Sequence, residues 1–390
     1  MKKLMSFAVM MLSAMTASAQ QEVGKFSVAQ FITLLFILSA VPSVAQQIRT
    51  IDKDGQPIPY VSVLTTDAKY IGITDLDGIL KDVKGADTIA VSHVAYKSKL
   101  YKVNGKSGSI ILEDADFGLP EIVVKKKPYV YAQTYYRIFY YDDSLGVVYY
   151  RVGLTDNVID RKTKKLSANT RNASKAKYGI LKTVLNALVG SKLNKRSELP
   201  MKKIEESLKK SYEANKVKIT DEGPGKKRIS DFKGTVGYIT DNQSTGQRRY
   251  SVNMSKLYND KLEATGKTKE LAKREKRDAK KKNEQDNDYF VFRIDENGNY
   301  SPEDFMMMQY MTSFDKTEKD GRNVHVVMAL QVFTIDRAYV DKNELKALKK
   351  DNKIKMNYQN IRQFEQAHKI PALAPAIQKK LNELWKADEE

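Results

Sequence analysis

The chain has 390 residues, of which 41% are hydrophobic and 29% charged. It is therefore too hydrophobic to be disordered throughout and long enough for roughly two domains of ~100–200 residues. It contains no cysteine and only three histidines, which excludes disulfides, thiolate zinc sites and a cysteine nucleophile. Lysine and arginine exceed aspartate and glutamate by 19.

The three histidines, His93, His325 and His368, show no pair at metal-ligand spacing. No nucleophile elbow, phosphate-binding loop, zinc-protease helix or dinucleotide fingerprint is present. Each histidine is interpreted as a structural residue. Because no such motif is found, we expect no cofactor, no metal site and no enzymatic activity.

The first 46 residues resemble two export signals in tandem. Apolar runs at residues 7–15 and 31–41 are each followed by small residues, at 17–19 and 43–45, and then by glutamine. Each run is shorter than the ~20 residues of a membrane-spanning helix, although a single uncut anchor remains the alternative. We expect residues 1–46 to be removed, so that the mature protein begins near Gln46 with a net charge of +17. The predicted location is the periplasm or the outer membrane, without a lipoprotein anchor because there is no cysteine.

Residues 47–124 have the pattern of a β-sandwich. Short alternating runs at 60–64, 88–92, 109–112 and 121–124 are separated by turn residues about every 8–12 positions. Asp-x-Asp-Gly sequences at 52–55 and 75–78 predict tight turns.

Five blocks of this region resemble a known family. They are residues 54–59 (DGQPIP), 61–63 (VSV), 72–78 (GITDLDG), 89–92 (IAVS) with Tyr96, and 119–124 (LPEIVV). In this order they are similar to the carboxypeptidase D regulatory-like domain, which is common in exported proteins of Bacteroidetes. The resemblance implies a seven-stranded transthyretin-like β-sandwich without catalytic activity. The sequence departs from the family at Ala95, where the family usually has glycine. The expected turn at this position is therefore less certain than the fold.

Residues 125–128 (KKKP) are predicted to be a linker, and residues 129–390 a second domain of α+β class. A tyrosine-rich hairpin, 129–141 and 147–160, is followed by three helical segments. Further strands are predicted at 228–232, 235–240 and 248–253, and a charged helix at about 255–282. The last predicted strands are 289–294, 308–314, 324–333 and 335–340, before short terminal helices. The expected fold is mainly β: a sandwich followed by an antiparallel sheet, either open or an incomplete barrel, with inserted helices.

One predicted helix carries a broad apolar stripe. Its residues are Ile180, Leu181, Val184, Leu185 and Leu188. This helix is either part of the core or a plug that covers an apolar-ligand cavity. Adjacent aromatic residues of the hairpin, such as Tyr135 with Tyr136 and Tyr149 with Tyr150, place aromatic rings on both faces of the sheet. We expect the helix to cover one face, as in the incomplete barrels of periplasmic lipoprotein carriers.

Residues 267–282 form a basic run with seven lysines, two arginines and three acidic residues. The run is either a solvated helix face with ion pairs or a site for anionic lipid, glycan or another polymer. Without interleaved aromatic residues it does not predict a nucleic-acid platform. The candidate anionic-ligand residues are Lys273, Arg274, Lys276, Arg277, Lys280, Lys281 and Lys282.

Two further patterns are interpreted structurally. Methionine adapts to irregular gaps, so the cluster at 305–311 (FMMMQYM) predicts core packing more than a binding surface. The turn at Asp75 and Asp77 lacks the later ligands of a calcium loop.

Together these features predict a non-enzymatic, exported cell-envelope accessory or binding protein. Its expected partner is an envelope component, namely a lipid, a glycan or an outer-membrane protein, and not a nucleic acid. Two alternatives remain open. One is a hydrolase whose carboxylates converge only in the fold, and the other is a basic binder of anionic envelope polymers or lipid. The sequence makes no prediction of oligomeric state.

Overall fold

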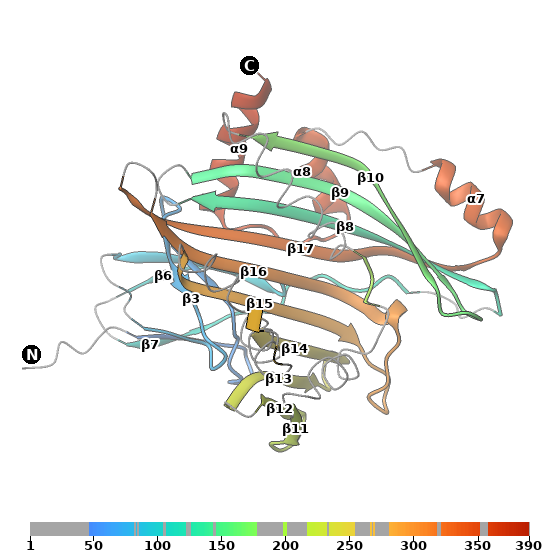
Figure 1. Ribbon diagram of the computed structural model, residues 1–390, viewed down its shortest axis with the longest axis horizontal. Helices are drawn as coiled ribbons and strands as arrows, with labels where there is room; N and C mark the ends of the chain where they lie inside the picture. The colour runs from blue at the N-terminus through green and yellow to red at the C-terminus, as the bar shows by residue number, and fades with distance from the viewer. Residues whose placement is uncertain are drawn as a thin grey trace, which may run out of the picture. The chain divides into compact units, whose positions relative to one another are not determined.

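The structure is a computed structural model (Figure 1), and it is mainly β, as the sequence predicts. The chain from Gln46 to Glu390 forms one compact unit. The structure describes residues 47–81, 83, 86–103, 107–121, 126–142, 146–177, 198–200, 217–231, 234–253, 266, 268–269, 281–317, 321–351 and 358–389.

Two small sheets form the N-terminal sandwich. One has the order β4-β1-β7 and the other β3-β2-β5-β6, and β1 pairs with β7 in parallel. Their inward side chains, among them Val61, Val63 and Val91, are fully buried. The strands are β1 (Ile48–Ile51), β2 (Ser62–Thr65), β3 (Tyr70–Ile73), β4 (Ile79–Leu80), β5 (Thr88–His93), β6 (Tyr96–Lys102) and β7 (Gly108–Ile111).

The predicted turns of the sandwich are confirmed. Asp52 Oδ1 accepts hydrogen bonds from the backbone N–H groups of Asp54, at 2.9 Å, and Gln56, at 2.8 Å. Gly55 has φ +76°, a conformation that glycine adopts without steric cost. Asp75 holds the second turn in the same way. Ala95 lies in the turn between β5 and β6 without a positive φ, so alanine is tolerated there.

Ten strands form the large sheet, in the order β10-β9-β8-β17-β16-β15-β14-β13-β12-β11 (Figure 1). Every neighbouring pair is antiparallel. The chain builds β8 to β10 outward, resumes at the opposite edge with β11, and returns so that β17 pairs with β8. The sheet is open. Its strands are β8 (Tyr129–Asp142), β9 (Gly146–Asp160), β10 (Leu166–Lys177), β11 (Lys218–Asp221), β12 (Lys226–Asp231), β13 (Gly234–Asn242), β14 (Gln247–Asn253), β15 (Lys281–Arg293), β16 (Phe305–Thr317) and β17 (Asn323–Val340).

Several predicted elements differ from the structure. Strand β10 was not predicted; pairing with β9 decides the conformation of this polar stretch. The predicted charged helix does not extend to residue 282, since Lys281 and Lys282 pair with β16. The strands predicted at 324–333 and 335–340 are one strand, β17, whose irregularity after Thr334 is absorbed as a register shift against β8. Strand β11 was not predicted.

The tyrosine-rich hairpin has aromatic residues on both faces, as predicted. Tyr135, Phe139 and Tyr150 belong to the core that the sheet shares with the sandwich. The neighbouring aromatic residues, which point to the other face of the sheet, belong to a second core. They are Tyr136, Tyr140 and Tyr149. The predicted cover helix, 180–189, lies outside the described residues. The methionine cluster is buried, and its members are divided between the two cores.

Three helices end the chain: α7 (Lys342–Asp351), α8 (Tyr358–Ala367) and α9 (Pro375–Glu389). Helices α8 and α9 contact the same core as the sandwich, with the Trp385 ring 6.0 Å from that of Tyr150. Arg137 of β8 is buried and forms a 3.0 Å ion pair with Glu365 of α8. The sandwich and helices α8 and α9 therefore pack against the same face of the large sheet.

Among the described residues, no helix has the length and apolar character needed to cross a membrane.

Candidate ligand pocket

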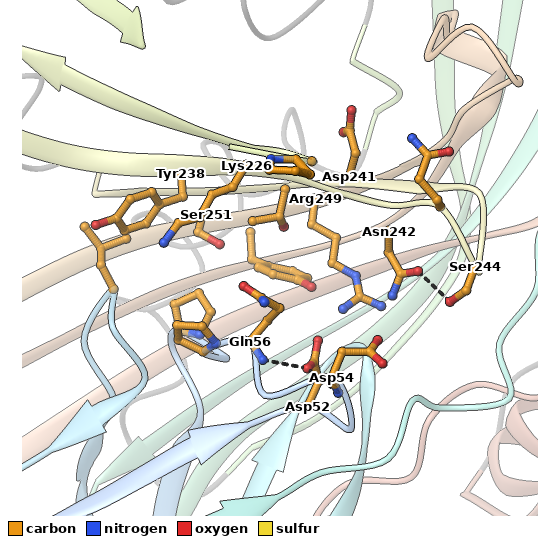
Figure 2. A pocket seen from close by; sticks show the side chains of 18 of the residues that line it. Asp52, Asp54, Gln56, Lys226, Tyr238, Asp241, Asn242, Ser244, Arg249 and Ser251 are labelled. Carbon is orange, nitrogen blue, oxygen red and sulfur yellow. Dashed lines mark hydrogen bonds between the residues drawn. The ribbon is translucent and has the colours of Figure 1, made fainter. Parts of the chain in front are cut away.

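A pocket of about 330 Å³ lies where the sandwich meets the β12–β15 part of the large sheet (Figure 2). The Asp52–Gln56 turn forms one wall. Strands β12 to β15 and the turn after β13 form the other. The polar side chains that line it include Asp52, Asp54, Gln56, Lys226, Tyr238, Thr240, Asp241, Asn242, Arg249, Ser251 and Tyr289.

The polar composition of the pocket follows from the alternation of side chains between the two faces of each strand. This alternation places a row of polar side chains on the sheet face that contacts the sandwich. Directly opposed residues of three neighbouring strands, Tyr238, Ser251 and Tyr289, follow one another across the sheet. Side chains two positions away along a strand share this face, which adds Thr240 from β13 and Arg249 from β14. Lys226 of β12, which pairs in register with Thr240, adds a fourth strand, so no single segment contains this wall.

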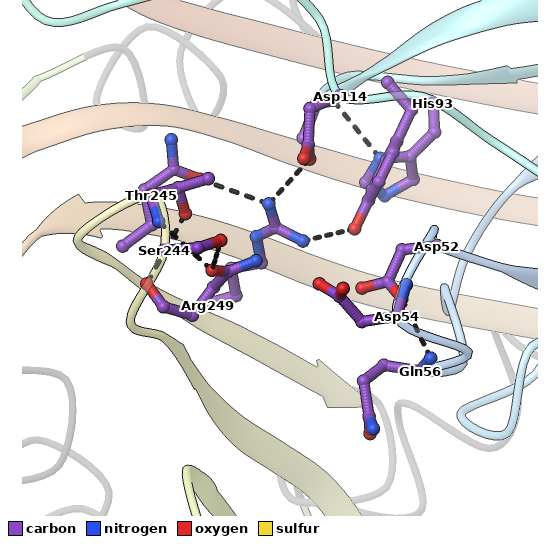
Figure 3. A network of polar contacts seen from close by, with 12 residues as sticks. Asp52, Asp54, Gln56, His93, Asp114, Ser244, Thr245 and Arg249 are labelled. Carbon is purple, nitrogen blue, oxygen red and sulfur yellow. Dashed lines mark hydrogen bonds and ion pairs between the residues drawn. The ribbon is translucent and has the colours of Figure 1, made fainter.

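Arg249 joins the two walls (Figure 3). Its side chain is only 8% exposed. Nη2 donates to Asp114 Oδ1 at 2.8 Å and to Gln247 Oε1 at 3.2 Å, while Nη1 donates to the hydroxyl of Tyr96. Asp114 and Tyr96 belong to the sandwich and Arg249 to the sheet. These contacts therefore hold the two walls of the pocket together.

His93 lies beside this network as a neutral side chain. Burial, reinforced by the positive charge of Arg249, lowers its pKa to about 3. Its Nδ1 accepts a 3.2 Å hydrogen bond from the N–H of Ala95, which places the ring proton on Nε2. The ring packs edge-on against Tyr289, with centroids 4.5 Å apart. His93 therefore has no ionisation near neutral pH that could serve acid–base chemistry.

The tyrosines of the pocket are also held in their neutral form. Burial raises the pKa of Tyr289 to about 12 and the pKa of Tyr96 well above its ordinary value. Burial also raises the pKa of Tyr238, with a smaller contribution from nearby carboxylates. These phenols act as neutral hydrogen-bonding groups and as apolar rings.

Three of the five charged residues that line the pocket lie close to a protein group of opposite charge. Asp241 accepts two bonds from Arg248, both 2.6 Å long. Lys226 lies 3.8 Å from a carboxylate oxygen of Glu222 and 4.4 Å above the ring of Tyr238. Arg249 is paired with Asp114. Arg249 is thus compensated before any ligand binds, whereas Lys226 shares the Glu222 carboxylate with Arg228, which lies closer to it, at 3.1 Å.

Two carboxylates of the turn have no cationic partner among the described residues. Asp52 is 7% exposed, and its Oδ1 is occupied by the turn amides. Asp54 is exposed and points toward the pocket (Figure 2). The uncompensated charge in this pocket is therefore negative, although the whole chain carries +19.

This arrangement is suited to binding more than to proton transfer. Its histidine and tyrosines stay neutral at physiological pH, and two of its three carboxylates are held by turn amides or by Arg248. No group of three potential metal ligands occurs within the described residues. The groups left open are hydrogen-bond donors and acceptors.

Within the described part of the chain, the residues that line this pocket include none that were predicted as binding sites. The candidate apolar residues 180–188 and the basic residues 273–280 lie outside the described residues. Lys281 and Lys282 lie in β15 and pair in register with Lys316 and Asp315.

From the sequence, the wall formed by residues 52–56 was predicted only as a turn and not as part of a pocket. The Asp-x-Asp-Gly signal at 52–55 correctly predicted its backbone, but the same signal recurs at 75–78 and in similar form at 295–298. The 75–78 turn contributes only Leu76 to this pocket, and no local signal identifies the 52–55 turn as the one that supplies its polar side chains. Arg249 likewise looked like an ordinary strand cation.

No family model matches the chain, and no curated protein matches it. Among solved structures, one similarity is to lipovitellin, with 7% identity and a TM-score of 0.26. It covers 55% of this chain and 26% of lipovitellin. Another is to a transferrin-binding protein B from Haemophilus parasuis, with 11% identity and a TM-score of 0.14, over 71% of this chain and 45% of that one. This chain therefore spans less than half of either protein.

Proposed function

We propose that the chain is a non-enzymatic, exported binding protein of the cell envelope, and that its ligand occupies the pocket between the sandwich and the large sheet. The observation that carries this proposal is a cavity of ligand size whose charged residues are largely paired while its neutral polar groups remain open. About 330 Å³ falls at the small end of the ~300–1,000 Å³ typical of ligand sites.

The sandwich is proposed to be a carboxypeptidase D regulatory-like domain that supplies one wall of this pocket. Seven strands in two packed sheets within the described residues support that proposal, as do the sequence blocks that carry the resemblance. A non-catalytic module is consistent with the role of its turn, which holds Asp52 and presents Asp54 and Gln56.

The hydrolase alternative has one favourable observation, because Asp52, Asp54 and Asp241 all line the pocket. A hydrolase with paired carboxylates needs two of them free to act on substrate. Asp241 is held by both nitrogens of an arginine fork, and Asp52 closes the turn. Only Asp54 remains open, which favours binding.

The test is calorimetric titration of the mature chain, residues 47–390, with neutral saccharides, a fatty acid and an anionic polymer. The variant is Thr240→Trp, which fills the pocket from β13. The control is Thr220→Trp, the same change at an exposed position of β11 outside the pocket. We expect one ligand class to bind the wild type and the control without being consumed, and to lose binding in Thr240→Trp.

Two outcomes would contradict the proposal. Equal binding to Thr240→Trp and to the control would place the ligand elsewhere. Conversion of a bound probe to product, followed by chromatography, would support the hydrolase.

Export has its own test, which is mass spectrometry of the mature N-terminus. The proposed processing predicts a chain that begins at or near Gln46. A stable product that retains residues 31–41 would indicate an anchor instead.

A further inference from the structure

We propose that the ligand of this pocket is an uncharged saccharide, held between the Asp52–Gln56 turn and the end of β13. This inference rests on the proposed binding function and specifies the class of ligand. It follows from the charge of the pocket, the type of its open hydrogen-bonding groups and its apolar surface.

The charge of the pocket disfavours an anion. Arg249 is paired with Asp114, and Lys226 shares Glu222 with Arg228, while neither Asp52 nor Asp54 has a cationic partner among the described residues. An incoming phosphate or carboxylate would meet the negative charge of these two carboxylates and would have to displace Asp114 to reach Arg249. Like charges brought together in a partly buried site disfavour binding.

The open hydrogen-bonding groups favour hydroxyls. The Asp54 carboxylate only accepts hydrogen bonds, whereas the Gln56 amide both donates and accepts. Asn242 has its Oδ1 occupied by Ser244 Oγ at 2.7 Å and by the N–H of Thr245 at 3.1 Å, so its Nδ2 remains to donate. A ligand hydroxyl can donate to the Asp54 carboxylate and accept from Asn242 Nδ2. An ammonium group only donates, so it would leave Asn242 Nδ2 without an acceptor.

The two walls contribute complementary groups. Asp54 and Gln56 come from the sandwich, and Asn242 comes from the large sheet at the opposite side of the pocket (Figure 2). A ligand with hydroxyls on several sides satisfies both walls at once, which a fatty acid with one polar end does not.

The remaining surface is apolar and rigid. Pro57, Pro59, Leu76 and Pro224 line the pocket together with the ring of Tyr238. Prolines and aromatic rings lose little conformational entropy when a ligand binds. They match the C–H faces of a sugar ring, whose hydroxyls point outward along its edges.

The experiment uses mature chain and saccharide probes that differ in charge. Neutral probes are maltotriose, cellotriose, mannotriose and N-acetylated chitotriose. The cationic probe is the glucosamine trimer, and the anionic probe is trigalacturonic acid. We expect at least one neutral trisaccharide to bind more tightly than both charged probes. Its affinity should change less than about twofold between about 0.05 and 0.5 M salt, since a neutral ligand releases no counterions.

The variant Asp54→Asn should weaken binding of that trisaccharide about tenfold, the effect of losing one charged hydrogen bond. The matched control is Glu296→Gln, which removes an exposed turn carboxylate outside the pocket and changes the net charge equally. Its affinity should equal that of the wild type. Thermal unfolding of both variants checks that folding is preserved.

The outcomes separate the two proposals. If a charged probe or a fatty acid binds best and Thr240→Trp abolishes that binding, the pocket is a binding site but the saccharide inference is wrong. If neutral trisaccharides bind equally to Thr240→Trp, the pocket assignment itself is wrong. If no neutral trisaccharide binds the wild type, the saccharide inference is overturned.

Discussion

Replacing Arg249 by methionine tests the contact that holds the pocket together. The side chain of Arg249 is 8% exposed and that of its partner Asp114 30% exposed. The change leaves Asp114 and the hydroxyl of buried Tyr96 without their donor. Breaking a buried ion pair costs ~3–5 kcal/mol. Water reaches Asp114 and recovers part of this, so we expect Arg249→Met to lower the free energy of unfolding by about 3 kcal/mol.

The assay is urea unfolding of the mature chain, followed by far-UV circular dichroism and by the fluorescence of Trp385 in α9. Both signals should shift together, because the chain from Gln46 to Glu390 is one compact unit. The control is Arg293→Met, the same change at an arginine that is 44% exposed, for which the expected loss is below ~1 kcal/mol. An equal, small loss in both variants would show that Arg249 does not hold the sandwich to the sheet.

Three further predictions concern stability. Arg137→Met should cost ~3–5 kcal/mol in urea unfolding, because it leaves a carboxylate of α8 buried without its 1%-exposed partner; a loss below ~1 kcal/mol would contradict this. His93 has a folded-state pKa of about 3, below the ~6.5 of the unfolded chain, so the unfolded state binds the extra proton between these values. The contribution of neutral His93 to the free energy of unfolding is complete above pH ~6.5 and is lost as the pH falls, by ~1.4 kcal/mol per pH unit. His93→Gln should therefore flatten the pH dependence of the free energy of unfolding between pH ~5 and ~6.5. An unchanged pH dependence would mean that other groups cause it. Gly153→Ala should cost ~1–3 kcal/mol, because its Cβ would lie 2.5 Å from the hydroxyl oxygen of buried Tyr136; Gly118→Ala, with open space around it, is the control.

Local signals predicted the elements that local physics determines. Asp52 and Asp75 each hold an Asp-Gly turn through their own backbone amides, which a short stretch of sequence reveals. The tyrosine-rich hairpin was predicted because alternation fixes which faces adjacent residues occupy.

Long-range pairing determines what the sequence did not predict. Residues 166–177 lack a strand pattern and become a strand because β9 offers a partner along its whole length. Strand β17 passes Thr334 without ending, since a register shift against β8 absorbs the irregularity. Such outcomes depend on the neighbouring strand and not on the local propensity of the segment.

The candidate pocket is harder still to predict, because its walls are distant in sequence. The Asp52–Gln56 turn and Arg249 are separated by nearly half of the chain, and their meeting depends on the packing of the sandwich on the sheet. In the sequence, Arg249 follows another arginine, Arg248, and strand alternation gives them different partners. One holds Asp241 and the other reaches the sandwich.

The most direct test of the account is amide hydrogen exchange of the mature chain with and without its best-binding neutral trisaccharide. If the ligand binds between the two walls, exchange should slow in two separate segments at once, the turn at residues 52–56 and the turn at residues 242–246. The exchange of α8 and α9 should be unchanged. Protection of one turn alone, or of neither, would contradict a ligand site built jointly by the sandwich and the large sheet.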